Sequence, residues 1–229
     1  MKVIFKKCVV GLLAFTAVVQ IHAQDEDPVK KCGFVRFVHA VAPGTGPLFC
    51  EVDGSNIRPD GYEFGDVTGG VAYKPGAHEV KIRREGVKEG TTRINVALNE
   101  TTILIPFAER VPATDEEPAH WEIRILRLKQ LEPLSERGAT FVSVSQQPEI
   151  KVEMRDMKGK WDAAYVKRLS IAQLPIAFPR GYVPLRIGEQ PLESIPISDN
   201  GNYVVLLYDD PEGKTKALNF RDYKYLSAD

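Results

Sequence analysis

The sequence predicts an all-β protein made of two consecutive antiparallel β-sandwich domains. Three observations support this fold class: short runs of alternating apolar and polar residues, turns rich in Gly, Pro, Asn and Asp between them, and almost no stretch with a helical period. In the run His78–Arg83, for example, Val80 and Ile82 point to one side while charged residues point to the other. This alternation is typical of an antiparallel strand with one buried face.

Residues 1–23 have the pattern of a secretory signal peptide. Three lysines and no acidic residue accompany the apolar run Cys8–Val19, and the small residue Ala23 ends the segment. The apolar run is shorter than the roughly 20 residues that a membrane-spanning helix needs. We therefore expect an exported protein, periplasmic or secreted, that is not inserted in the membrane after the signal is cleaved.

The chain without this leader is mildly acidic. The 229 residues include 30 Lys and Arg against 31 Asp and Glu; removing the leader leaves 206 residues with 27 basic and 31 acidic side chains, a net charge of −4. Nucleic-acid binding depends on an excess of positive charge that displaces counterions from phosphates. We therefore expect no nucleic acid among the partners.

Two polar, proline-containing stretches interrupt the strand pattern. Glu109–Ala119 is expected to be a long exposed loop or a linker, and Leu131–Gly138 is expected to be the domain boundary. Trp121–Leu128 has the pattern of a closing strand and Thr140–Val144 that of an opening strand. The resulting division is a lead-in segment at 24–33, an N-terminal β-sandwich at 34–131 and a C-terminal β-sandwich at 138–229, with about 100 residues in each sandwich. Within the second sandwich, Trp161–Ser170 suits a helix or a strand equally well.

Cys32 and Cys50 are the two cysteines that remain after the signal is removed. An even pair in an oxidising compartment predicts a disulfide, and closing so short a loop contributes about 3 kcal/mol. If Phe34–Val41 and Leu48–Asp53 formed a simple hairpin, Cys50 would face His39 and Cys32 would lie about 23 Å away. A bridge therefore requires that these two segments do not pair in that way; the alternative is two unpaired small apolar residues.

Residue patterns that support catalysis are largely missing from the sequence. His39, His78 and His120 lie far apart and lack the paired spacings of a zinc site. There is no nucleophile elbow, phosphate-binding glycine loop or dinucleotide fingerprint. The acidic turn Asp209–Gly213 is more typical of a hairpin tip than of a calcium site. We therefore expect a protein that is not an enzyme and holds no metal or cofactor.

Two surfaces are candidates for binding a partner or a glycan. Lys81 and Arg83 belong to a basic cluster that is expected on the solvated outer face of a hairpin, where it could meet an acidic polysaccharide. Tyr223 and Tyr225 lie in the C-terminal run Phe220–Tyr225, whose poor alternation indicates an exposed edge. Other aromatic residues of the strands are expected in the sandwich cores, although such rings also stack on sugars.

Four short patterns of the first half carry a family resemblance: Phe34–Ala40, Glu51–Gly54, Phe64–Gly70 and Lys74–Val80. This series resembles an uncharacterised bacterial surface-domain family with the same opening strand, V-D-G turn, F-G-D-V stretch and P-G hairpin. The whole chain is similar to the alginate biosynthesis protein F family, which shares the signal peptide, the first strand, the hairpin and two sandwiches. The cysteine pair and the loop Val111–Pro118 depart from that family's pattern.

The resemblance implies a non-catalytic periplasmic accessory of alginate O-acetylation, which works beside a membrane-bound O-acyltransferase and a periplasmic acetyltransferase. That family has no catalytic motif to carry over to this chain. We therefore expect an exported accessory protein that assists O-acetylation of an alginate-like exopolysaccharide, with periplasmic acetyltransferase components or the polysaccharide as partners. The alternative is a secreted carbohydrate- or surface-binding β-sandwich module with no acetylation role.

Overall fold

A computed structural model describes residues 31–130 and 137–222, and these residues are nearly all in strands and turns, which confirms the predicted all-β class. The first half contains β1 (Gly33–Phe37), β2 (Thr45–Val52), β3 (Ser55–Asn56), β4 (Val71–Tyr73), β5 (Gly76–Glu85), β6 (Val87–Val96), β7 (Thr101–Val111) and β8 (His120–Lys129). The second half contains β9 (Arg137–Ser143), β10 (Glu149–Arg155), β11 (Trp161–Lys167), β12 (Ile171–Pro175), β13 (Gly181–Ile187), β14 (Gln190–Ile197), β15 (Gly201–Asp209) and β16 (Thr215–Asp222).

The first half is one eight-stranded sheet, in the order β3-β2-β5-β6-β8-β7-β1-β4, which folds over on itself. One buried cluster joins Val52, Val80 and Ile82 from one part of the sheet to Phe37 and Leu104 from the other. The fold occurs where β6 meets β8, at the parallel pair Lys88 and Glu122. The sheet therefore encloses its own core in the manner of a sandwich.

The second half consists of two four-stranded sheets, β11-β10-β13-β14 and β12-β9-β15-β16. Val152, Leu185 and Ile195 from the first of these sheets pack against Phe141 and Val205 from the second. Alternate residues of β10, such as Glu149 and Lys151, point away from this core and are exposed.

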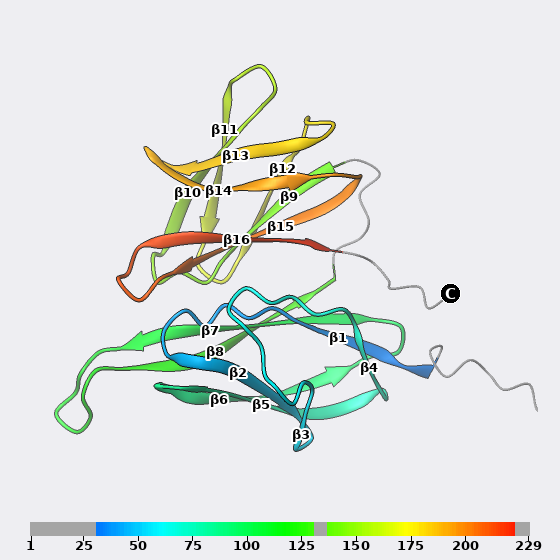
Figure 1. Ribbon diagram of the computed structural model, residues 1–229, viewed down its shortest axis with the longest axis vertical. Helices are drawn as coiled ribbons and strands as arrows, with labels where there is room; N and C mark the ends of the chain where they lie inside the picture. Colours follow the sequence, from blue (N-terminus) through cyan, green and yellow to red (C-terminus); the bar gives the residue numbers. More distant parts are fainter. Residues whose placement is uncertain (1–30, 131–136, 223–229) are drawn as a thin grey trace, which may run out of the picture.

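A third apolar cluster, called the seam below, lies between the two halves (Figure 1). The seam occupies the other face of the strands that also line the two cores, because neighbouring residues of a strand point to opposite faces. Its buried members are Val38, Ala40, Ile103, Ile105, Phe107, Val142, Val144, Val204, Leu206 and Phe220. Strands β7, β9 and β15 are consequently buried on both faces along most of their length.

Several expectations about the elements can be compared with the structure. The stretch after Glu109 is the exposed tip of the β7–β8 hairpin at 112–119, and Trp161–Ser170 begins with strand β11, not a helix. Most strand pairs are antiparallel as expected, but β1 with β7, β6 with β8 and β9 with β15 are parallel. The signal peptide at 1–23 and most of the boundary at 131–138 lie outside the described residues. In the described part, no helix is long and apolar enough to cross a membrane.

Candidate functional site

A polar cleft of about 570 Å³ lies at one edge of the seam, where the two halves meet. Strands β6, β7 and β8 contribute its first wall, including Thr92, Glu109 and Arg124. The turn that follows β11 contributes the opposite wall through Arg168 and Leu169. The cleft therefore depends on both halves of the chain.

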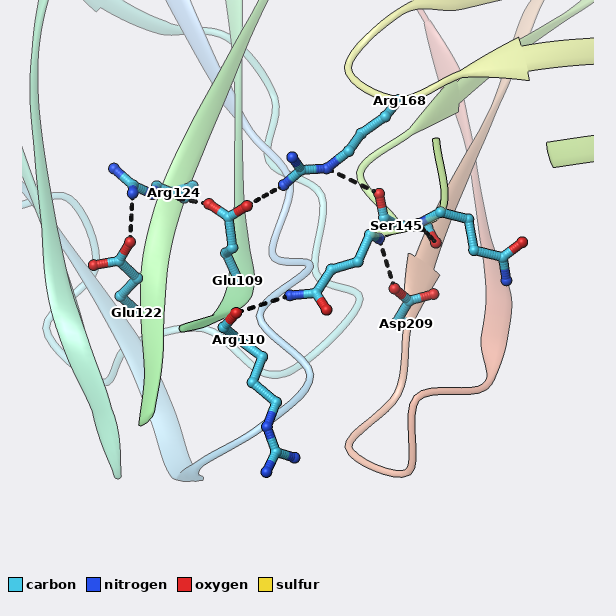
Figure 2. A network of polar contacts seen from close by, with 9 residues as sticks. Glu109, Arg110, Glu122, Arg124, Ser145, Arg168 and Asp209 are labelled. Carbon is cyan, nitrogen blue, oxygen red and sulfur yellow. Dashed lines mark hydrogen bonds and ion pairs between the residues drawn. The ribbon is translucent and has the colours of Figure 1, made fainter. Parts of the chain in front are cut away.

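An ion-pair network crosses this cleft (Figure 2). The carboxylate of Glu109 accepts hydrogen bonds from Arg168 in the second half and, at 3.0 Å, from Arg124 on the neighbouring strand. Arg124 also pairs with Glu122, with 2.5 Å between nitrogen and oxygen. Arg168 donates a further bond of 3.2 Å to the carbonyl of Ser145. Two arginines thus hold two carboxylates in a fixed arrangement across the junction.

Strand geometry brings three of these side chains together. Glu109 and Glu122 are direct partners in the β7–β8 ladder, and Arg124 lies two residues from Glu122 on the same face. The sheet closes tightly below them because Gly90 has no side chain: a Cβ there would lie 2.5 Å from the carbonyl oxygen of Ile123. The sheet closure therefore needs glycine at this position.

The loop that follows β9 is tied to the same region. The side-chain amide of Gln146 donates to the carbonyl of Arg110 at 3.2 Å, and its backbone N–H donates to Asp209 at 2.7 Å (Figure 2). A second opening of about 330 Å³ adjoins this loop and includes Trp121, over whose ring Arg110 lies at 5.8 Å. Both openings are thus bounded by residues that also join the halves.

A second polar clamp fastens the seam. Arg36 pairs with Asp222 at 2.9 Å, and the two side chains are only 7% and 2% exposed. Arg36 also donates to the carbonyl of Thr68, and Gln130 donates to Asp222. The pair joins β1 of the first half to β16 of the second half, and each charge needs the other as long as both stay buried.

The carboxylates that line the cleft are engaged in ion pairs. Three carboxylates line it: Glu89 pairs with Lys81, whereas Glu109 and Glu122 pair with arginine. Among the described residues, no group of three His, Cys, Asp or Glu side chains is placed to hold a metal ion. A bound molecule would meet fixed charges and threonine hydroxyls at the edge of the cleft.

The predicted disulfide is absent, because Cys50 is a free thiol buried in the first core. Strand β1, which follows Cys32, pairs with β4 and β7, whereas β2, which carries Cys50, pairs with β3 and β5. The two segments do not form the simple hairpin, which a disulfide would have excluded. They nevertheless belong to separate parts of the sheet. Burial raises the pKa of the Cys50 thiol to about 12, so it is a poor nucleophile.

The basic cluster lies on the outer face of the β5–β6 hairpin and is largely neutralised there. Lys81 pairs with Glu89 at 2.9 Å, and Arg83 pairs with Glu51. Arg84 instead turns inward and donates to a backbone carbonyl. Tyr223 and Tyr225, the other predicted surface residues, lie outside the described residues.

The three histidines occupy separate places in the first half. His39 is fully buried, and its ring receives the N–H of Val41 at 3.2 Å and lies 3.5 Å from the guanidinium of Arg84. Burial, with a smaller effect of Arg84, lowers the pKa of His39 to about 3. His78 contacts Asp53 at 2.7 Å, and this hydrogen bond raises the pKa of His78 while it lowers that of Asp53.

The central member of the cleft network could not be found from the sequence. The sequence predicts a loop or linker at Glu109, and the segment that holds Arg168 suits a helix or a strand equally well. The alternation in Trp121–Ile125 does place Glu122 and Arg124 on one face, which is the one available signal. The pairing of Glu109 with Arg168 spans 59 residues and depends on how the halves dock.

No protein-family model matches this chain, and no curated protein matches it. Among solved structures, the Bacillus anthracis TIE protein shares 11% identity over an alignment that covers 79% of this chain and 50% of that one, with a TM-score of 0.25. This chain thus spans about half the length of that protein. A likeness of this size supports no conclusion about fold or function.

Proposed function

We propose that the protein is an exported, non-catalytic accessory protein that assists O-acetylation of an alginate-like exopolysaccharide by holding partner proteins. The observation that carries this proposal is the junction between the halves, where an apolar seam and two polar clamps set the cleft walls at fixed positions. A rigid, two-walled cleft with paired charges is suited to orienting another macromolecule. The proposed polymer and partners come from the family resemblance.

The first experiment is deletion of the gene followed by measurement of polymer yield and acetyl content. We expect the acetyl content to fall while the yield of polymer stays unchanged. Complementation with the wild-type gene should restore acetylation. An unchanged acetyl content in the deletion strain refutes the proposal.

A cleft variant connects that phenotype to the structure. Glu109→Gln combined with Arg168→Gln removes the charge pair across the cleft but keeps a polar side chain at both positions. We expect this variant to accumulate normally and to restore acetylation poorly, with weaker co-purification of the acetyltransferase components. Arg83→Gln is the matched control, because Arg83 is an exposed member of an ion pair outside the cleft lining. Equal complementation by both variants would show that the cleft is not the binding site.

The alternative is a secreted carbohydrate-binding module with no acetylation role. The observation that favours it lies away from the cleft, on the outer sheet of the second half, where tyrosine rings are exposed beside cationic side chains. A deletion strain with normal acetyl content, together with direct glycan binding by the purified protein, would support this function instead.

A further inference from the structure

The sheet β11-β10-β13-β14 lies on the side of the second half away from the seam (Figure 1). Its outer face carries aromatic and basic side chains. Because Ala164, Val166, Val183 and Leu185 point into the core, the residues between and beside them point outward. Tyr165 and Tyr182 are 61% and 74% exposed. Aromatic strand residues usually pack in a core, so two exposed rings on one sheet face need an explanation.

Three cations lie on this face between the two tyrosines. Lys151 is the direct ladder partner of Tyr165, and Arg155 is the partner of Trp161 on the same pair of strands. Arg186, from β13, lies opposite Glu153 of β10. The period of two places all of these side chains on the same side of the sheet, in a band that crosses three of its four strands, β11, β10 and β13.

Two carboxylates of β10 lie on this face: Glu149, which is the ladder partner of Lys167, and Glu153, which is shielded by its neighbours. Glu153 accepts hydrogen bonds of 2.9 Å from both Lys151 and Arg186, and its side chain is 13% exposed. Lys151 is 49% exposed and Arg186 34% exposed, so the positive groups face solvent more than the negative group does. The three cations Lys151, Arg155 and Arg186 thus outnumber the two carboxylates Glu149 and Glu153, and Glu153 is already engaged, so the band keeps a net positive charge.

Arg186 is fixed in place as well as charged. Its guanidinium lies 4.0 Å from the centre of the Trp161 ring and pairs with Glu153. A planar guanidinium held by an aromatic ring and a carboxylate loses little conformational freedom when it binds an anion. Trp161 thus positions a cation, while the rings of Tyr165 and Tyr182 remain available for contact.

We propose that this band binds an anionic polysaccharide directly, with Tyr165 and Tyr182 stacking on sugar rings and Lys151, Arg155 and Arg186 pairing with carboxylates of the polymer. A polyuronate fits this band because each of its rings offers an apolar C–H face for an aromatic ring and a carboxylate for a cation. The band is open to solvent and crosses adjacent strands, which suits an extended chain. The proposal goes beyond the accessory function, because it requires neither acetylation nor the cleft.

The experiment measures binding of the purified protein to polygalacturonate and to dextran, a neutral control, by retardation in native gels that contain the polymer and by calorimetry. We expect retardation by polygalacturonate alone, with affinity that falls steeply as salt increases because charges are screened. No binding at low salt, or equal binding to dextran, refutes the proposal.

Variants locate the binding surface. Tyr165→Ala with Tyr182→Ala, and separately Arg155→Gln, should each weaken polygalacturonate binding about tenfold, because they remove a stacking platform or a charge-assisted contact. Lys81→Gln with Arg83→Gln is the matched control, since it removes two exposed cations from the first half and should leave the affinity unchanged. All of these side chains are at least partly exposed, and thermal unfolding of each variant verifies that it folds.

The outcomes separate this proposal from its competitors. Undiminished binding by the band variants, or a loss only in the Lys81 and Arg83 control, places the polymer elsewhere and refutes the band. If the band instead mediates self-association, the mass of the protein in light scattering should depend on Tyr165 and Tyr182 and should not change when polymer is added. This result also refutes the proposal. Because the test uses the purified protein alone, binding can be absent while gene deletion still lowers polymer acetylation. Conversely, the protein can bind the polymer while gene deletion leaves acetylation unchanged, so the two proposals fail separately.

Discussion

The buried, neutral His39 makes the free energy of unfolding depend on pH, and substituting this one residue measures its share of that dependence. His39 is fully buried, its two ring nitrogens lie near the N–H of Val41 and the guanidinium of Arg84, and no carboxylate contributes to its pKa shift. Both neighbours are hydrogen-bond donors, so an imidazolium would have no acceptor there. The folded protein therefore resists protonation of this ring.

The magnitude follows from the pKa of His39, which is about 3 in the folded chain against about 6.5 for an ordinary histidine. Because the unfolded chain binds the proton more readily, the free energy of unfolding falls as pH drops below the unfolded pKa, by about 1.4 kcal/mol per pH unit. Between pH 7 and pH 5 this amounts to about 2 kcal/mol.

Urea unfolding of the wild type and of His39→Gln at the two pH values provides the assay. The neutral amide keeps an acceptor for the N–H of Val41 and cannot titrate, so the wild type should lose about 2 kcal/mol more than the variant on acidification. The other ionisable groups are the same in both proteins and cancel in the comparison. Equal pH dependence in the two proteins would refute the proposed burial of a neutral His39.

Three further predictions concern the seam and an exposed ion pair. Leu206→Ala should lower the free energy of unfolding by about 2–5 kcal/mol in urea titrations, because Leu206 is fully buried in the seam; a loss below about 1 kcal/mol contradicts this packing. Asp222→Ala should cost about 3–5 kcal/mol by leaving the Arg36 guanidinium buried without its carboxylate, and adding Arg36→Met should recover much of that loss. Asp53→Asn should lower the pKa of His78 in an NMR titration, because the hydrogen bond with Asp53 raises this pKa. The contact stabilises the fold most at pH values at which His78 is protonated and Asp53 is ionised. This stabilisation is lost as the pH rises through the folded pKa of His78. An unchanged titration in Asp53→Asn would contradict the contact.

The strands of the outer sheets could be located from the sequence because they have one buried and one solvated face. Val80 and Ile82 are buried in β5 while Glu79 and Arg83 on the same strand are not, as the alternation predicts. The same alternation identified β10 correctly. Turn residues marked the ends of these strands, because Gly and Pro restrict or release the backbone whatever the tertiary context is.

The exposed strand faces and the pairing of strands were harder to predict, because both depend on contacts between residues that are distant in the sequence. Cys50 entered the first core instead of a disulfide, since β1 and β2 pair with different strands. Tyr182 and Tyr165, which belong to strands and therefore suited a core, lie on a solvated sheet face. Alternation alone shows that a strand has two faces, but it does not show which neighbour covers each face.

The sequence by itself determined the all-β class and most strand positions, because both follow from local backbone preferences and a period of two. The tertiary structure decided the parallel pairs, the seam and the cleft. Strands β7, β9 and β15 bury both faces, so their apolar runs have no alternation that could reveal a second contact surface. Glu109 and Arg168 meet only because that second surface docks the two halves, and such docking depends on long-range packing that no local pattern encodes.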